Sequence, residues 1–403
     1  MKRKVLSFAA ASLMFAGISA FASPIKSIRF EGLKKTKEFV IQRDLKNYIG
    51  AEDSDEVVHI LETQLQSAGL FSEIKIEKKQ SDDGVELSIA VKEKISFLAV
   101  PMAMVSSGSV MGGAFVLDSN AFGLRDLVVL GGFFSKSEVR GIWMFSKPPA
   151  GHVPGFSFFG SAGKKNQIFR NLADDDVIDY NMISANSGIT ITEQFTNIFS
   201  ASLGTNLGFK NFDEKDQETI ENNKYMELRT GVRLSHTDWN GVFLSTKSAE
   251  FNYDSVFYTS HYIWHTFSPR IIVQQPVVSD SFRVNLNVNG FHTKYAPYSA
   301  YKGNNALGVN ILPSKFGTDS GLGGSAGVEY AAFKTKLGTF SVYGAYQFAY
   351  VRDLDEEYKV NQGTAMGIQM YLKQLAIPAM CFGMTCNATE KQMGAFFTLG
   401  MSF

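Results

Sequence analysis

The segment "FFTLGMSF" at residues 396–403 alternates apolar and small residues. Its apolar positions are Phe397, Leu399, Met401 and Phe403. Successive side chains of a β-strand point to opposite faces, so this strand has one apolar face and one small or polar face. The closing strand of a transmembrane β-barrel needs this pattern, because one face meets lipid and the other a polar lumen. Taken alone, the segment also fits the edge strand of a soluble sandwich.

The beginning of the sequence agrees with an outer-membrane destination. Lys2, Arg3 and Lys4 precede an apolar stretch at 5–21, and small residues flank Phe21. This pattern predicts a secretory signal peptide over residues 1–22, with cleavage before Ser23; the alternative is an N-terminal membrane anchor. No later run of 18 apolar residues follows, which excludes a helical membrane protein.

Composition supports a barrel and argues against other classes of protein. The chain of 403 residues has 34 Phe and 15 Tyr, and aromatic residues form girdles around membrane barrels. Its 39 basic and 39 acidic residues give a net charge of zero, whereas a nucleic-acid-binding protein would show a basic excess. We therefore expect no nucleic-acid partner.

Residues 24–94 have a mixed pattern that predicts a small α+β domain. Alternating apolar residues predict a first strand at 25–30, and Thr36 and Ser54 are expected to cap two helices. The first helix should place Phe39 on its apolar face. Two further strands, near 71–76 and 85–91, are joined by the turn at 82–84. The order is β-α-α-β-β.

This domain resembles a POTRA domain, the periplasmic module of the BamA/TamA outer-membrane assembly superfamily. The resemblance lies in "IRFEGLKKT" (28–36), "LQSAGLFSEIKIE" (65–77) and "GVELSIAVKE" (84–93). In that family such modules guide unfolded substrates by pairing an extended segment with an exposed sheet edge. Only one module fits here. The alternative is an unrelated α+β domain.

From residue 95 to 403 the pattern predicts an all-β transmembrane barrel of 16 antiparallel strands. The expected strands are 95–106, 109–118, 124–134, 138–146, 154–164, 176–191, 196–209, 223–235, 243–256, 261–274, 281–292, 322–333, 338–351, 363–373, 376–386 and 391–403. An even number of strands places both barrel ends on one side. With the POTRA-like domain in the periplasm, the longest connections then face outward.

The barrel region resembles the same superfamily. "MGGAFVLDSNAFGLRD" (111–126) is similar to the family's first hairpin and periplasmic turn, in which Asp118, Asn120 and Gly123 are turn-forming residues. "GGSAGVEYAAF" (323–333) resembles the twelfth strand and includes Glu329.

One departure concerns the long loop between strands eleven and twelve, which in the superfamily folds into the lumen. There a Val-Arg-Gly-aromatic tip ties to an acidic residue on strand thirteen. Here the nearest tip is Lys315, Phe316 and Gly317, and the acidic motif falls at Gln347 and Ala349. A Lys cannot form the bidentate fork of an Arg, so we expect this loop to be held differently or loosely.

Strands one and sixteen close the barrel, and in the superfamily this seam is a lateral gate for substrate strands. Pro101 removes a hydrogen-bond donor from strand one, while Gly394 and Gly400 on strand sixteen offer no side chain for cross-strand packing. These residues and Phe403 are the expected gate seam. The other interpretation of Pro101 is an ordinary strand start at the periplasmic side.

We find no catalytic, cofactor or metal motif and expect no enzyme. Cys381 and Cys386 should lie on opposite faces of one strand unless it bends. The resemblance implies insertion or export of polypeptides at the cell outer membrane of a Gram-negative type. Expected partners are outer-membrane lipids, an unfolded or secreted polypeptide, and periplasmic accessory proteins. The alternative is a non-translocating pore, scaffold or surface antigen of the same ancestry.

Overall fold

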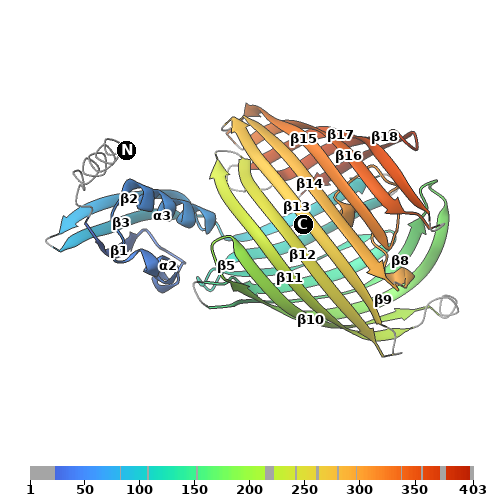
Figure 1. Ribbon diagram of the computed structural model, residues 1–403, viewed down its shortest axis with the longest axis horizontal. Helices are drawn as coiled ribbons and strands as arrows, with labels where there is room; N and C mark the ends of the chain where they lie inside the picture. Colours follow the sequence, from blue (N-terminus) through green and yellow to red (C-terminus); the bar gives the residue numbers. More distant parts are fainter. Residues whose placement is uncertain are drawn as a thin grey trace, which may run out of the picture. The chain divides into compact units, whose positions relative to one another are not determined.

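The computed structural model describes residues 23–81, 83–106, 109–150, 153–213, 222–240, 243–259, 263–278, 281–295, 297–336, 338–354, 357–372 and 378–399. The expected signal peptide, and with it Gly400 and Phe403 of the expected seam, lies outside these residues. The chain divides between Lys94 and Ile95 into two compact units, drawn as a small domain and a barrel in Figure 1.

The first unit is a three-stranded sheet with two α-helices. Its elements are β1 (Ile25–Glu31), α2 (Glu38–Leu45), the 3-10 helix η1 (Lys46–Tyr48), α3 (Asp55–Ser67), β2 (Phe71–Ser81) and β3 (Gly84–Glu93). β3 is the central strand, with β1 parallel to it and β2 antiparallel. The order of elements is the one that the sequence predicted.

Local chemistry explains where the helices of this domain begin and end. The Ser54 side chain accepts a hydrogen bond from the Val57 backbone N–H (3.3 Å), which caps α3 as expected. Gly69 adopts a positive φ of 72° directly after that helix. The prediction for Thr36 was wrong, because α2 begins at Glu38 without a side-chain cap. Phe39 also points to solvent and is 60% exposed.

The second unit is a closed barrel of 16 antiparallel strands, which confirms the predicted fold class. The strands are β4 (Phe97–Ser106), β5 (Ser109–Ala121), β6 (Asp126–Ser135), β7 (Glu138–Lys147), β8 (Gly155–Arg170), β9 (Asp176–Gln194), β10 (Phe199–Phe212), β11 (Asn223–Asn240), β12 (Phe243–Tyr258), β13 (Ile263–Val278), β14 (Phe282–Lys294), β15 (Ser320–Lys334), β16 (Gly338–Arg352), β17 (Tyr358–Leu372), β18 (Pro378–Asn387) and β19 (Gln392–Leu399). Each pairs with its neighbours in sequence, and β19 pairs with β4.

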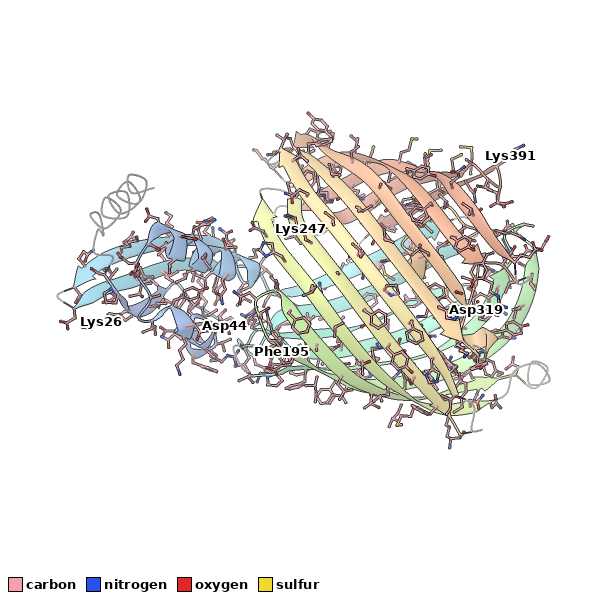
Figure 2. All side chains as sticks on the ribbon, in the orientation of Figure 1. Lys26, Asp44, Phe195, Lys247, Asp319 and Lys391 are labelled. Atoms are coloured by element: carbon pink, nitrogen blue, oxygen red, sulfur yellow. The ribbon has the colours of Figure 1, made fainter. Side chains whose placement is uncertain are left out.

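The barrel has two ends, which we call the near rim, where β4 starts, and the far rim, where β4 turns into β5. The tilted strands run between them in Figure 1. Lys247 lies toward the near rim and Asp319 at the far rim (Figure 2). β8 reaches further toward the far rim than the sequence predicted, to Arg170 instead of residue 164, so only residues 171–175 remain to connect it to β9.

The longest connection, residues 295–319, follows β14 at the far rim and contains the 3-10 helix η2 (Tyr298–Ala300) and the short helix α5 (Asn304–Leu307). We call it the inward loop. None of the helices in the described ranges is long and apolar enough to span a membrane.

Candidate functional site: the barrel lumen and its seam

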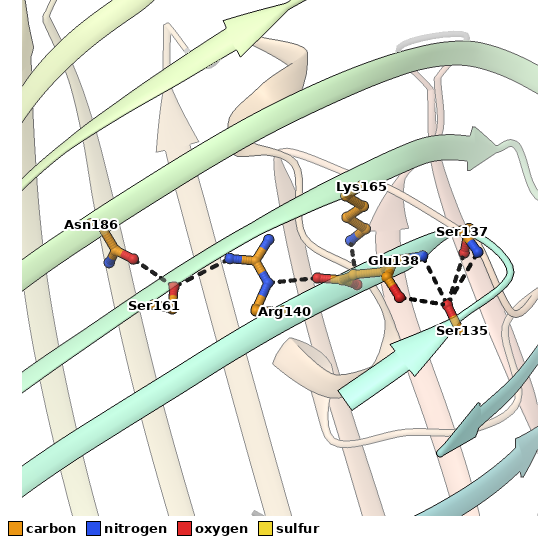
Figure 3. A network of polar contacts seen from close by, with 7 residues as sticks. All are labelled: Ser135, Ser137, Glu138, Arg140, Ser161, Lys165 and Asn186. Carbon is orange, nitrogen blue, oxygen red and sulfur yellow. Dashed lines mark hydrogen bonds and ion pairs between the residues drawn. The ribbon is translucent and has the colours of Figure 1, made fainter. Parts of the chain in front are cut away.

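A row of charged and polar side chains crosses the inner face of β7, β8 and β9 (Figure 3). Arg140 donates from Nε to Glu138 (2.6 Å) and from Nη1 to the Ser161 hydroxyl (3.2 Å). Ser161 in turn donates to Asn186 (2.6 Å), and the Lys165 ammonium lies 3.8 Å from Glu138. Residues directly opposite on neighbouring strands share a face, so these contacts form one transverse row.

The row continues over β10, β11 and β12. Asn186 donates to Asn206 (3.4 Å), and Asn206 donates to Glu227 (3.0 Å). Arg229 bridges Glu227 (2.9 Å) and Asp254 (2.7 Å). We call this row of side chains, from Glu138 on β7 to Asp254 on β12, the polar belt. Positive and negative charges alternate along it, so it stabilises the wall without a large net charge.

A buried ion pair lies on the inner face of the barrel, close to the near rim. Arg283 on β14 donates to Glu329 on β15 (2.5 Å), and Glu329 is 2% exposed. The hydroxyls of Ser341 and Tyr371 also donate to the Glu329 carboxylate. The Phe243 ring lies 4.8 Å from the guanidinium of Arg283. A buried carboxylate requires such partners.

The inward loop lies inside the barrel, where its backbone is held by neutral amides of the wall. The Asn310 backbone N–H donates to the Gln347 side chain (2.9 Å), and Asn387 donates from Nδ2 to the Ile311 carbonyl (3.1 Å). Leu307, Val309 and Ile311 are buried with Phe291, Ala349 and Val351 of the wall.

The tip of the inward loop contacts the opposite wall at β8. The Arg170 backbone N–H donates to the Lys315 carbonyl (2.9 Å), and Phe316 is buried beside Leu172. A Cβ at Gly317 would overlap the Phe169 ring, so glycine is required for this approach. The loop therefore spans the lumen from β16 and β18 to β8.

The inward loop follows what the resemblance implied, but the polar contacts that hold it differ. Gln347 stands where an acidic residue was expected and binds a backbone N–H, not an Arg. Its partner, Asn310, precedes the tip by five residues. Each of these neutral hydrogen bonds stabilises the loop by about 0.5–1.5 kcal/mol. The Arg283–Glu329 pair instead joins two strands of the wall.

The inner face differs between the two sides of the barrel. Over β4–β7 it is an apolar wall, made of Leu98, Met102, Phe115, Leu117, Leu127, Val129, Phe133, Ile142 and Met144. Over β13–β17 it is an amide wall, made of Gln274, Asn285, Asn287, Gln347 and Gln369. A cavity of about 1240 Å³ lies between the inward loop and the amide wall, and Met104 of β4 and Met111 of β5 also line it.

The seam has four paired positions within the described residues, from Ala103–Ser106 of β4 to Phe396–Leu399 of β19. Pro101 lies opposite Ala114 of β5, and Gly394 opposite Thr385 of β18. Neither is one of the four described seam pairs, and their role at the seam stays a prediction.

The expected turn lies between β5 and β6 at the near rim. Asn120 is buried, and its backbone N–H donates to the Asp118 side chain (3.1 Å). Its side-chain oxygen accepts from the Arg125 N–H (2.9 Å), which closes the turn. Gly123 adopts a positive φ of 73°, a conformation that glycine permits. These residues therefore shape the turn.

Cys381 and Cys386 are both free on β18. Cys381 lines the cavity and Cys386 is exposed, so the two face opposite sides. Over the described part of the chain, no three His, Cys, Asp or Glu side chains come together as a metal site.

In the first domain, two sequence motifs meet at Glu93. Its carboxylate accepts the backbone N–H groups of Lys35 and Thr36, both at 2.8 Å. Burial raises the pKa of Glu93, but hydrogen bonds from Thr36 and from the Lys34–Thr36 backbone outweigh it and lower the pKa below its usual value. The "KKT" segment is thereby fixed to the end of β3.

Sequence reasoning missed several residues of the lumen. Arg283 was not singled out, and its partner Glu329 is 46 positions away. The polar belt joins residues from six strands, so only the strand register reveals it. A signal did exist for the inner face of β14, where Asn285, Asn287 and Asn289 alternate with apolar residues.

Comparisons with known proteins agree with this architecture. The family model of the POTRA domain, described as surface antigen variable number repeat, matches residues 23–94. BamA from Haemophilus ducreyi lacking POTRA domains 1-3 is 15% identical, with a TM-score of 0.60 over 94% of this chain and 85% of that chain. CdiB from Acinetobacter baumannii is 13% identical, with a TM-score of 0.64 over 95% and 74%.

CdiB from Escherichia coli is 10% identical, with a TM-score of 0.64 over 94% of this chain and 77% of that chain. Among proteins with curated functions, no match to the sequence was found. The expected resemblance is confirmed at the level of fold: the chain carries a POTRA domain followed by a 16-stranded barrel with the fold of BamA and CdiB.

Proposed function

We propose that this protein is an outer-membrane barrel that inserts or exports polypeptide substrates. The observation that carries the proposal is the combination of one POTRA domain with a closed 16-stranded barrel, which matches BamA and CdiB over most of their length. In this proposal the POTRA domain lies in the periplasm and the far rim faces outward.

The POTRA sheet offers an edge at which to receive a substrate. β2 is an edge strand of 11 residues, longer than the 7 residues of β1, and among the described residues it pairs only with β3. An extended polypeptide can add to such an edge through backbone hydrogen bonds, with little dependence on its side chains. We assign β2 as the substrate guide.

The seam between β4 and β19 is the proposed lateral gate. Pro101 on β4, which has no N–H to donate to a strand ladder, supports this assignment. On the β4 side of the seam, β5 and β6 are apolar on both faces: Phe115 and Val129 face inward, and Val116 and Leu130 are exposed outward. Such strands suit an opening toward lipid.

The experiment is depletion of the protein followed by quantitative proteomics of outer-membrane and secreted fractions. We expect a defined set of barrel or secreted proteins to fall while other outer-membrane proteins stay constant. An unchanged proteome would contradict the proposal. The second candidate, a passive pore, is favoured by the polar cavity of about 1240 Å³ and predicts single-channel conductance without any change in the proteome.

A further inference from the structure

Three asparagines occupy alternate positions on the inner face of β14. We call Asn285, Asn287 and Asn289 the asparagine ladder. Within the described residues, the side-chain oxygen of each is buried and has no hydrogen-bond partner. Asn289 is 6% exposed as a whole residue.

The ladder oxygens have no hydrogen-bond partner although two donor-bearing side chains lie beside them: on β13, Gln274 is directly opposite Asn285 and Arg270 is directly opposite Asn289. On β15 the directly opposite residues are Gly327, Ser325 and Gly323, of which only Ser325 has a side-chain hydroxyl. From the inward loop, Gly308 approaches so closely that a Cβ there would overlap the Nδ2 groups of Asn287 and Asn289. The loop thus covers the amide nitrogens of these two residues. A buried acceptor without a donor is costly, and three on one strand indicate a site that a donor-bearing ligand completes.

The spacing of the ladder indicates the kind of ligand. Alternate residues of a strand are about 6.6–6.8 Å apart, and an extended polypeptide presents the N–H groups of one edge at the same interval. Each asparagine has an oxygen that accepts and an NH₂ that donates, so it can bind both an N–H and a C=O of a backbone. Recognition of this kind is independent of the side chains of the ligand.

We propose that the asparagine ladder binds the backbone of an extended polypeptide segment inside the lumen. The proposal rests on the proposed function, since it assigns the lumen contact of the transported chain. Asn285 and Asn287 line the cavity and receive the segment first. Displacement of Gly308 then gives access to Asn289.

The test measures binding of a fluorescent, uncharged 12-residue Gly/Ser/Ala peptide to the full-length protein in detergent micelles. A second peptide has the same sequence but is N-methylated at every second residue, which removes the donors along one edge. We expect the native protein to bind the unmethylated peptide about 10-fold more tightly or better, as two or more net hydrogen bonds imply.

The triple variant Asn285→Ala/Asn287→Ala/Asn289→Ala should bind both peptides equally weakly. The matched control is Asn186→Ala/Asn206→Ala, because these lumen asparagines already have partners in the polar belt. This control should keep the preference for the unmethylated peptide. If the triple variant does not fold, Asn287→Ala alone should lose several-fold of the preference.

Equal binding of the two peptides to the native protein would overturn the proposal, and so would a preference that survives in the folded ladder variants. Displacement of the peptide by maltohexaose would assign the site to oligosaccharides instead. No peptide binding, together with a positive depletion experiment, overturns the ladder and leaves the proposed function standing. Ladder-dependent binding with an unchanged proteome supports the ladder as a peptide site and removes the transport function.

Discussion

The apolar wall and the amide wall of the lumen differ in whether their side chains need hydrogen-bond partners. The apolar wall on β4–β7 packs Phe115, Leu117 and Val129 against one another, so its inner face needs no partner from outside the wall. The amide wall on β13–β17 presents side chains such as Asn287 and Gln347, which need hydrogen-bond partners. The inward loop provides such partners to some of them and leaves others unpaired.

The seam lies where an apolar inner face and a polar inner face meet. β4 belongs to the apolar wall, while β18, next to β19, carries the polar residues Thr385 and Asn387 on its inner face. In the proposed function, a chain at the seam meets apolar side chains on one side and amides on the other. An amphipathic β-strand fits this environment.

The largest effect on stability should come from breaking the buried ion pair between Arg283 and Glu329, which lies close to the near rim. Arg283→Met leaves the Glu329 carboxylate buried without a cation, which we expect to destabilise the barrel by about 3–5 kcal/mol. The measurement is the denaturant midpoint of the fraction that runs as a folded, heat-modifiable band on gels.

Two variants control this experiment. Arg283→Met/Glu329→Gln removes both charges and should recover most of the lost stability. Arg229→Met removes a cation that is 42% exposed and bridges two carboxylates, and it should cost clearly less than Arg283→Met. A full loss of stability in the double variant would show that shape, not charge, is what matters at this position.

A change in the apolar wall should have the next largest effect. Phe115→Ala removes a buried ring from between β4 and β6 and should cost about 2–4 kcal/mol in the same assay. Phe115→Leu keeps the wall apolar and should cost about 1 kcal/mol. A negligible effect of the alanine variant would mean that this wall does not contribute packing energy.

A smaller effect is expected where the amide wall holds the loop. Asn387→Ala removes the donor to the Ile311 carbonyl, worth about 0.5–1.5 kcal/mol, together with the hydrogen bond to Asn361 and those that its side-chain oxygen accepts from the following turn. Trypsin should then cleave after Lys302 or Lys315 up to about 10-fold faster, while the barrel stays folded. Thr385→Ala lies on the same face of β18 and serves as the control. Unchanged cleavage would show that the hydrogen bond from Asn387 does not contribute to holding the loop.

The smallest effect on either wall should come from removal of the POTRA domain. The domain has its own core around Leu61 and Leu87, separate from the cores of the barrel. We therefore expect deletion of residues 24–94, with the segment 1–22 retained, to leave the heat-modifiable band in place and to abolish function. Loss of the folded band would show that the two units fold as one.

The strand pattern could be predicted because alternation of side chains is a local property. All 16 strands overlap the ranges that the sequence predicted, although β8 extends past its predicted end at residue 164 into residues such as Lys165. Beyond the membrane-facing part, a strand no longer needs an apolar outer face. The pattern therefore marks the embedded part of a strand better than its ends.

The side-chain contacts inside the lumen were harder to predict, because they depend on how neighbouring strands are aligned with one another. Arg283 and Glu329 meet only because β14 pairs with β15 in one particular alignment. The resemblance implied an inward loop, but no residue of the sequence showed that Gln347 and Asn387 would hold its backbone. A one-residue slip would turn these side chains outward.

The most direct test of the account is a disulfide across the seam. Met104 and Thr398 are directly opposite and both line the cavity, so Met104→Cys/Thr398→Cys should form a bond readily. The variant must also carry Cys381→Ser and Cys386→Ser, since Cys381 lies directly opposite Thr398 on β18. Ala365→Cys/Thr385→Cys locks β17 to β18 in the same background and is the control.

We predict that the oxidised seam variant reproduces the proteome of depleted cells, that reduction restores the missing proteins, and that the control lock has no effect. The barrel should remain folded in every case, as judged by its heat-modifiable band. A normal proteome in cells whose seam is quantitatively locked would contradict the lateral gate and leave the passive pore as the better account.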